Sequence, residues 1–140
     1  MQRAITFDFW DTIVIDESDE PKRTMKGLES KAVARRRLFV NDVLTAYPKQ
    51  EESMVNAAFD HCNKVFRHWW KVEHHTPHIG VRLREGYSFL GLEPPASFHE
   101  MVEQYAALEV DTPPDLAPGI RECLEDISST HQIVLTWPMT

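Results

Sequence analysis

Asp8, Asp11 and Thr12 follow a short apolar segment, and they are the first residues in the chain that could do chemistry. Residues 4–9 alternate large apolar and polar side chains, which predicts a β-strand. Ligands of open parallel sheets bind beyond the carboxyl ends of the strands, where we expect Asp8 to lie. Its carboxylate could attack an electrophile and form a covalent intermediate, or bind Mg²⁺ together with water and a substrate phosphate. The alternative is that Asp8 and Asp11 are polar turn residues.

Five histidines gather in the middle of the chain, at positions His61, His68, His74, His75 and His78. Imidazole is a common transition-metal ligand, and a spacing of seven puts the first two on one helix face. No Cys-x-x-Cys or His-Glu-x-x-His pattern accompanies them. A helical metal-binding module, a lining for a substrate entrance and ordinary surface or packing roles therefore all stay open.

A basic cluster at Lys31, Arg35, Arg36 and Arg37 could attract an anionic substrate, as could Arg82 and Arg84 further along. The alternative, which we favour, is a solvated helix face. The two cysteines, Cys62 and Cys123, are too few for a disulfide framework, and we expect both thiols to be buried and inert.

The 140 residues have an ordinary globular composition, with 42% hydrophobic and 26% charged residues. A net charge of -7 disfavours a nucleic-acid binder, because such proteins need a basic face. No apolar run approaches the ~18 residues of a membrane-spanning helix, and the first residues lack the pattern of a signal peptide. We therefore expect a cytoplasmic protein with no nucleic-acid or membrane partner. The sequence does not indicate an oligomeric state.

The remaining segments are predominantly helical in pattern. Apolar spacing of three and four predicts helices over 30–46, 51–72, 76–91, 97–108 and 118–128, with Thr76 and Ser97 as N-caps. Residues 16–26 are polar and lack an apolar period, which predicts an exposed connector. Residues 132–136 contain an unbroken apolar run, which is typical of a strand covered on both faces.

This order predicts an α/β protein with a partial doubly wound, Rossmann-like parallel sheet and an inserted all-helical cap. The core would comprise residues 1–14 and 113–140, and the cap residues 15–112. Two parallel strands alone do not make a stable sheet. We therefore expect these residues to be the N-terminal part of a longer protein, with completion of the sheet by a partner as the alternative.

The segment from Ile5 to Val14 resembles the first motif of the haloacid dehalogenase (HAD) superfamily, an apolar strand followed by Asp-x-Asp-x-Thr. The helical block after it resembles the cap that many members insert at this point. Residues 116–124 resemble the segment that re-enters the core. Residues 133–136 resemble the second motif, an apolar strand ending in Thr or Ser. The resemblance covers the layout of the whole chain.

The resemblance implies that Asp8 is the nucleophile, attacking phosphorus in phosphatases or carbon in dehalogenases. Thr12 would support the turn beside the substrate, and the hydroxyl of Thr136 would bind the transferred phosphoryl group. In metal-dependent members, Mg²⁺ would be held by Asp8 and by the backbone carbonyl of Trp10.

The chain departs from the family at the general acid, where Trp10 replaces the second Asp and cannot exchange a proton. Asp11, one residue further on, could be a substitute acid. The family's third motif, a Lys or Arg, and its fourth, an acidic pair that holds Mg²⁺, follow the second motif and would lie beyond these residues. We expect a HAD-like phosphatase that acts on a small phosphorylated substrate through an aspartyl intermediate, inactive as the 140-residue chain alone. A 2-haloacid dehalogenase-like hydrolase and a non-catalytic binding or assembly protein are the alternatives.

Overall fold

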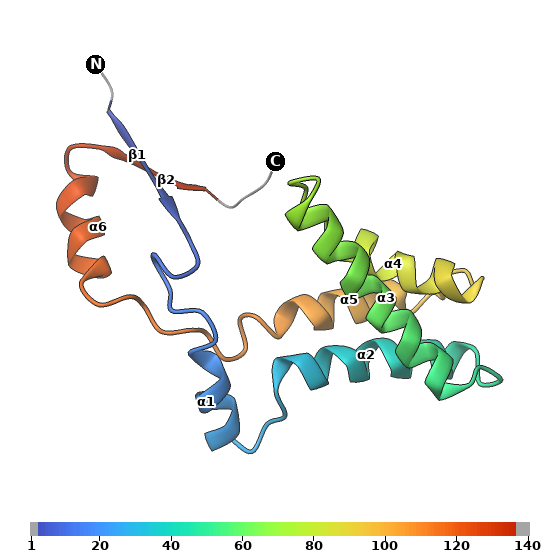
Figure 1. Cartoon of the computed structure of the whole chain (residues 1–140). Helices are drawn as coiled ribbons and strands as arrows, with labels where there is room; N and C mark the ends of the chain where they lie inside the picture. Colours follow the sequence, from blue (N-terminus) through green and yellow to red (C-terminus); the bar gives the residue numbers. More distant parts are fainter. Residues whose placement is uncertain (1–2, 137–140) are drawn as a thin grey trace.

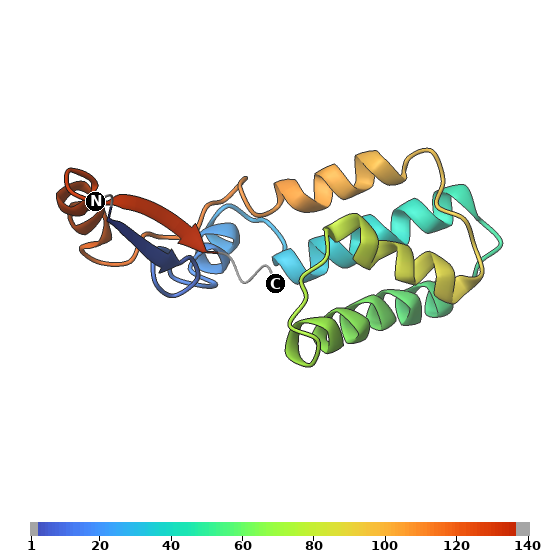
Figure 2. The ribbon, with the colours of Figure 1, turned by 90° about the horizontal axis from the view of Figure 1, so that it is seen from above.

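A computed structural model describes residues 3–136, which form six helices and two strands (Figure 1). Along the chain these are β1 (Ala4–Asp8), α1 (Asp19–Met25), α2 (Lys31–Ala46), α3 (Glu52–Lys71), α4 (Ile79–Leu90), α5 (Phe98–Ala107), α6 (Ile120–Ser128) and β2 (Gln132–Thr136). Helices α2 to α5 form a bundle, whereas β1, β2 and α6 form a separate small unit (Figure 2). The segments before α2 and after α5 connect the two.

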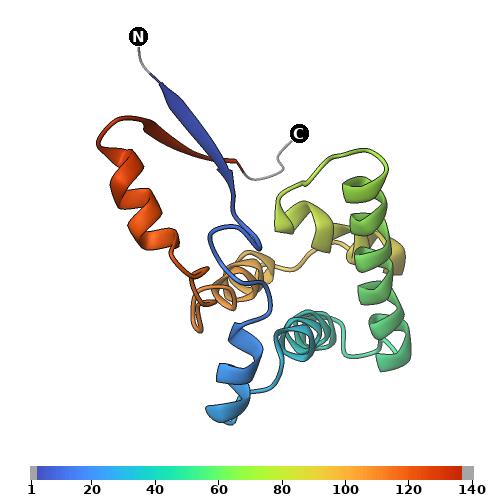
Figure 3. The same ribbon diagram turned by 60° about the vertical axis from the view of Figure 1, so that its left-hand side comes forward.

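The only sheet of the described residues pairs β1 and β2 in parallel, with Ala4 opposite Gln132 and Asp8 opposite Thr136. Helix α6 lies along one face of this pair (Figure 3). On that face Phe7 is half-buried, whereas Asp8 on the other face is exposed. The expected doubly wound, Rossmann-like core is therefore wrong for residues 3–136, because such a core needs several parallel strands with helices on both faces.

The expectation that β2 is covered on both faces is also wrong. Val134 and Leu135 are 36% and 56% exposed, although both belong to the unbroken apolar run. A continuous apolar run shows that a segment is hydrophobic. Whether the segment is buried depends on which other elements pack against it.

The polar segment 16–26 contains the helix α1, so its interpretation as an exposed connector was wrong. The carboxylate of Asp19 is only 1% exposed and forms an ion pair with Lys31 Nζ at 3.0 Å. Arg23, also buried, donates from Nε to the carbonyl of Glu29 at 2.9 Å. Polar contacts with residues that follow the helix thus hold α1, and such contacts leave no apolar period in the sequence.

The bundle has one hydrophobic core, which includes the fully buried rings of Phe39, Tyr87 and Tyr105. Helix α4 passes very close to α2 and α3 at Gly86. A β-carbon at this position would lie 2.5 Å from Phe39 Cζ and 2.7 Å from Cys62 Sγ. The absence of a side chain at Gly86 is therefore what allows the three helices to pack.

The helix ends agree with the sequence prediction at Gly91 and differ from it at Thr76. Gly91 ends α4 in the left-handed conformation with a φ of 68°, as expected for a C-cap glycine. The same helix begins only at Ile79. His78 is its N-cap, and the Nδ1 of that residue accepts a hydrogen bond from the Gly80 amide at 3.1 Å.

A second hydrophobic cluster lies in the strand unit, where Ile13, Val14 and Ile120 are buried. Phe7 and Trp10 are among the side chains packed against it. This cluster is separate from the bundle core, whereas the proposed boundaries at residues 14 and 112 stay a prediction. Within the described part of the chain, no helix is long and apolar enough to cross a membrane.

Candidate functional site

Asp8 and Thr136 are register partners at the carboxyl ends of β1 and β2. Hydrogen-bonded neighbouring strands run about 4.8 Å apart, so these two main chains lie side by side. The Asp8 carboxylate is exposed, and its Oδ1 accepts a hydrogen bond from the Phe9 amide at 2.8 Å. The side chain of Thr136 lies outside the described part of the structure. The parallel pairing thus brings together two segments that are 128 residues apart, as the difference between positions 136 and 8 shows.

The chain turns sharply after Asp8. The amides of Ile13 and Val14 both donate to the carbonyl of Phe9, at 2.9 and 3.1 Å. Asp11 has a φ of 52°, and its Oδ1 accepts a hydrogen bond from the Asp16 amide at 3.0 Å. This bond gives the Asp11 carboxylate a role in the turn. A carboxylate used in this way is poorly placed to be the substitute acid.

The segment that follows the bundle holds this turn in place. The amide of Ile15 donates to the carbonyl of Asp115, and the amide of Ala117 donates to the carbonyl of Ile13, both at 2.8 Å. Thr12 is exposed within the turn. The loop beside Asp8 is therefore fixed by backbone hydrogen bonds to a segment about 100 residues further along.

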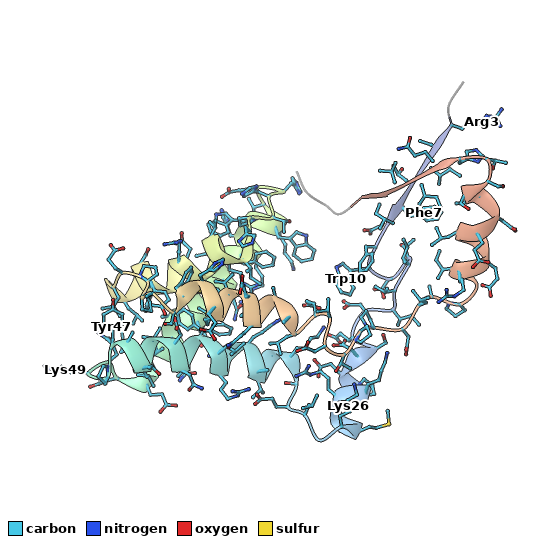
Figure 4. The ribbon with its side chains drawn as sticks, turned by 180° about the vertical axis from the view of Figure 1, so that it is seen from behind. Arg3, Phe7, Trp10, Lys26, Tyr47 and Lys49 are labelled. Atoms are coloured by element: carbon cyan, nitrogen blue, oxygen red, sulfur yellow. The ribbon has the colours of Figure 1, made fainter. Side chains whose placement is uncertain are left out.

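Trp10 lies just beyond the end of β1, on the side of the loop that faces the bundle (Figure 4). Its ring is packed edge-to-face on Phe9, with ring centroids 5.2 Å apart and an angle of 83° between the planes. Trp10 thus presents an apolar ring between the strand unit and the bundle.

A cavity of about 830 Å³ lies between this loop and the bundle. Its walls are predominantly apolar, and Phe9, Trp10, Phe66 and Ile79 are among the lining residues. A few polar side chains point into the same space, namely Arg35, His78, Arg82, Tyr105 and Glu109. This size and composition are typical of small-molecule sites. Asp8 is not among the lining residues, although it directly precedes Phe9.

The structure separates the candidate histidines. The ring of His61 lies against Phe89, with centroids 5.0 Å apart, and His68 Nε2 contacts Glu73 Oε1 at 3.2 Å. His78 caps α4, whereas His74 and His75 are exposed. In residues 3–136, no three His, Cys, Asp or Glu side chains come together in a way that could hold a metal ion. Among these five histidines, only His78 lines the cavity between the loop and the bundle, as a residue at a substrate entrance would.

The basic cluster of α2 is not a solvated helix face throughout. Lys31 is buried and pairs with Asp19 and with Glu109, at 3.0 and 3.2 Å. Arg35 also contacts Glu109 and is half-buried, and only Arg37 is largely exposed. Successive residues of a helix point in different directions, so these four basic side chains do not form one surface that could attract a substrate.

Tyr105 is not among the candidate site residues of the sequence, because it lies within the apolar spacing that predicts the helix over 97–108. Its ring belongs to the bundle core, yet the residue also lines the cavity. An aromatic residue at apolar helical spacing has the same sequence pattern whether it packs in the core or lines a cavity.

Neither a family model nor a curated protein sequence matches this chain. The resemblance to the HAD superfamily therefore rests on the motif residues themselves.

Proposed function

We propose that this chain supplies the nucleophile of a HAD-like hydrolase that acts on small phosphorylated substrates. The observation that carries the proposal is the parallel register that sets Asp8 beside Thr136 at the carboxyl ends of both strands. This edge is where open parallel sheets bind ligands. The exposed carboxylate of Asp8 is accessible to a substrate there.

The proposed reaction has two displacements at phosphorus. A carboxylate oxygen of Asp8 attacks the phosphoryl group, and the bond to the leaving-group oxygen breaks while that oxygen takes a proton from water. Water then attacks the phosphorus of the aspartyl phosphate, which releases phosphate and restores the Asp8 carboxylate. In this scheme the hydroxyl of Thr136 donates to a phosphoryl oxygen and stabilises the charge that develops on it.

Asp8 and the main-chain carbonyl of Trp10 offer hard oxygen ligands, which fit Mg²⁺. Mg²⁺ uses one or two carboxylates and keeps several waters beside a substrate phosphate, so two protein ligands suit part of its coordination shell. A bound Mg²⁺ would neutralise phosphate charge during the attack.

Two features limit what these 140 residues do by themselves. Trp10 cannot protonate a leaving group, and Asp11 is hydrogen-bonded within the turn. The chain alone is therefore proposed to bind phosphoryl analogues without turning over substrate.

A non-catalytic binding or assembly protein is the second candidate, and the position of Trp10 favours it. An indole in place of a proton donor suits a site that binds its ligand without cleaving it. A 2-haloacid dehalogenase-like hydrolase is compatible with the same residue, because dehalogenases of the family also lack the second Asp. The two hydrolases share Asp8 as nucleophile, and the binding protein does not need one.

The test is binding of a beryllium fluoride complex, which mimics a phosphoryl group on a carboxylate. We expect Mg²⁺-dependent thermal stabilisation of the wild-type chain by this complex, and loss of the stabilisation in Asp8→Asn. Asp16→Asn is the matched control, because Asp16 is exposed in the same loop and its carboxylate accepts a hydrogen bond only from the Glu17 amide among the contacts described. Equal stabilisation of wild type and Asp8→Asn, or none of either, would count against Asp8 as nucleophile and favour the binding protein.

A further inference from the structure

A second cavity, the bundle cavity, has a volume of about 300 Å³, lies at the junction of α2, α3, α4 and α5, and opens to solvent beside the exposed Val33. It is lined by Ala32, Val33, Arg35, Arg36, Phe59, Asn63, Arg82 and Tyr105. Arg35, Arg82 and Tyr105 also line the larger cavity, so these three side chains lie between the two spaces. None of the residues of the first segment, including Asp8, borders this cavity.

The lining of the bundle cavity is strongly cationic. It includes three guanidinium groups and no carboxylate. The acidic partners of these arginines lie outside the lining: Arg36 pairs with Asp60 at 2.5 Å, and Arg35 contacts Glu109. In a chain with a net charge of -7, this concentration of positive charge stands out from the average surface.

Aromatic rings hold the three guanidinium groups. Arg82 lies over Phe66 at 4.4 Å from the ring centroid, and Arg36 lies over Phe59 at 4.9 Å. Arg35 lies over the ring of Tyr105 at 5.2 Å. Stacking of this kind orients a guanidinium plane. The terminal nitrogens of Arg35, Arg36 and Arg82 contact Glu109, Asp60 and Asn63, so Nε is the donor that Arg35 and Arg82 have left. The site is therefore organised before any ligand binds.

Three buried polar atoms at this junction have no hydrogen-bond partner among the described residues: Arg35 Nε, Arg82 Nε and the hydroxyl of Tyr105. Tyr105 is only 1% exposed. Buried polar groups are almost always hydrogen-bonded, and arginine nitrogens can only donate. All three groups can thus be satisfied by one kind of ligand, namely an acceptor with several oxygens.

The electrostatic environment of Arg35 also favours an anionic ligand. Burial lowers the pKa of its guanidinium; the neighbouring Tyr105 opposes the shift, and the positive charge of Arg82 adds to it. An anion between the two arginines would offset their mutual repulsion and the loss of hydration.

We propose that the bundle cavity binds a small oxyanion, a carboxylate or phosphate group, through Arg35, Arg82 and Tyr105. Either a free anion or the anionic end of a larger molecule in the adjoining cavity would supply this chemistry. The site goes beyond the proposed function, because it uses neither Asp8 nor Thr136.

The experiment is calorimetric titration of the 140-residue chain with inorganic phosphate and, separately, with malonate, at constant ionic strength set by chloride. Saturable binding of at least one anion is expected. Arg82→Gln should weaken it at least tenfold, and Tyr105→Phe, which retains the ring, should weaken it severalfold. Arg84→Gln is the control, because Arg84 is exposed on the same helix and lies outside the lining.

Asp8→Asn should bind these anions as wild type does, so the outcome is independent of the nucleophile proposal. Circular dichroism establishes that each variant is folded, and Tyr105→Phe carries the test if Arg82→Gln does not fold. An absence of saturable binding to wild type would overturn the proposal. Binding that is unchanged in Tyr105→Phe, or equally weakened by Arg84→Gln, would overturn it too.

Discussion

Asp8 and Thr136 stand directly opposite each other in the parallel ladder of β1 and β2. The end of β1, which carries the carboxylate residue Asp8, therefore lies beside the end of β2, which carries the hydroxyl residue Thr136. Ligands of parallel sheets bind at this edge. The pairing also makes the contribution of each residue separately testable.

Replacement of Thr136 by Val should weaken Mg²⁺-dependent binding of the beryllium fluoride complex. The loss of one hydrogen bond to a charged group costs about 1.5–3 kcal/mol, which is roughly ten- to a hundredfold in affinity. Thr136→Ser keeps the hydroxyl and should retain most of the binding, as titration of the complex into each variant would reveal. Equal affinities for the Val and Ser variants would show that the hydroxyl does not contact the phosphoryl group.

The 140-residue chain should not hydrolyse a generic aryl phosphate in the presence of Mg²⁺. In the proposed reaction Trp10 supplies no proton, and the Asp11 carboxylate is hydrogen-bonded within the turn. Steady-state release of the aryl alcohol by the wild-type chain should equal that of Asp8→Asn. Turnover that disappears in Asp8→Asn would contradict this expectation and would establish catalysis by the chain alone.

The buried carboxylate of Asp42 should be important for the bundle. It accepts hydrogen bonds from the hydroxyls of Tyr87 and Ser97, the latter at 2.5 Å, and so connects α2 to α4 and to the start of α5. Asp42→Ala leaves the Tyr87 hydroxyl buried without its acceptor, which should lower the free energy of unfolding by about 3 kcal/mol.

Urea unfolding measures this loss, and Asn41→Ala, at the exposed neighbouring position, is the control with an expected change below about 0.5 kcal/mol. If the two variants unfold at the same urea concentration, the Asp42 hydrogen bonds do not stabilise the bundle.

Gly86→Ala should destabilise the bundle although alanine is the better helix former. The gain in helix propensity is about 1 kcal/mol, whereas the added methyl group would meet Phe39 Cζ at 2.5 Å and Cys62 Sγ at 2.7 Å. Overpacking of a core costs about 1–3 kcal/mol or more, so we expect a net loss and a lower Tm. Ser88→Ala, at an exposed position on the same helix, should leave the Tm nearly unchanged. A higher Tm for Gly86→Ala would mean that α4 shifts away at little cost.

The two thiols should differ sharply in reactivity, because the expectation that both are buried holds for Cys62 and was wrong for Cys123. An aromatic disulfide reagent at mildly alkaline pH should label Cys123 rapidly and Cys62 only after unfolding, and Cys123→Ser should remove the rapid phase. Rapid labelling that persists in Cys123→Ser would show that α3 and α4 open readily.

Burial also raises the pKa of Cys62 to about 11, so the folded state holds this proton more tightly than the unfolded chain does. The associated stability is complete below the ordinary thiol pKa and is lost as the pH rises towards 11. Unfolding midpoints that fall more steeply over this range in wild type than in Cys62→Ala would agree with this linkage.

The sequence alone determined the local elements other than α1. Apolar alternation predicted β1, and the unbroken run predicted β2 at its exact bounds, while spacing of three and four predicted α2 and α3 to within one residue. These patterns succeed because an element that buries one face must repeat its apolar side chains with the period of its own backbone. The end of α4 at Gly91 could also be predicted from the sequence, because the left-handed conformation of this residue depends on its having no side chain.

Only the tertiary structure decided which charged and polar groups are buried and what they meet. Helix α1 depends on an ion pair between Asp19 and Lys31, and the bundle cavity gathers Arg35, Arg82 and Tyr105 from three helices. The exposure of Leu135 likewise depends on what covers β2 and not on its apolar character. Such contacts join residues of different elements and have no period, so a sequence pattern does not reveal them, whereas the packing of the elements brings them together.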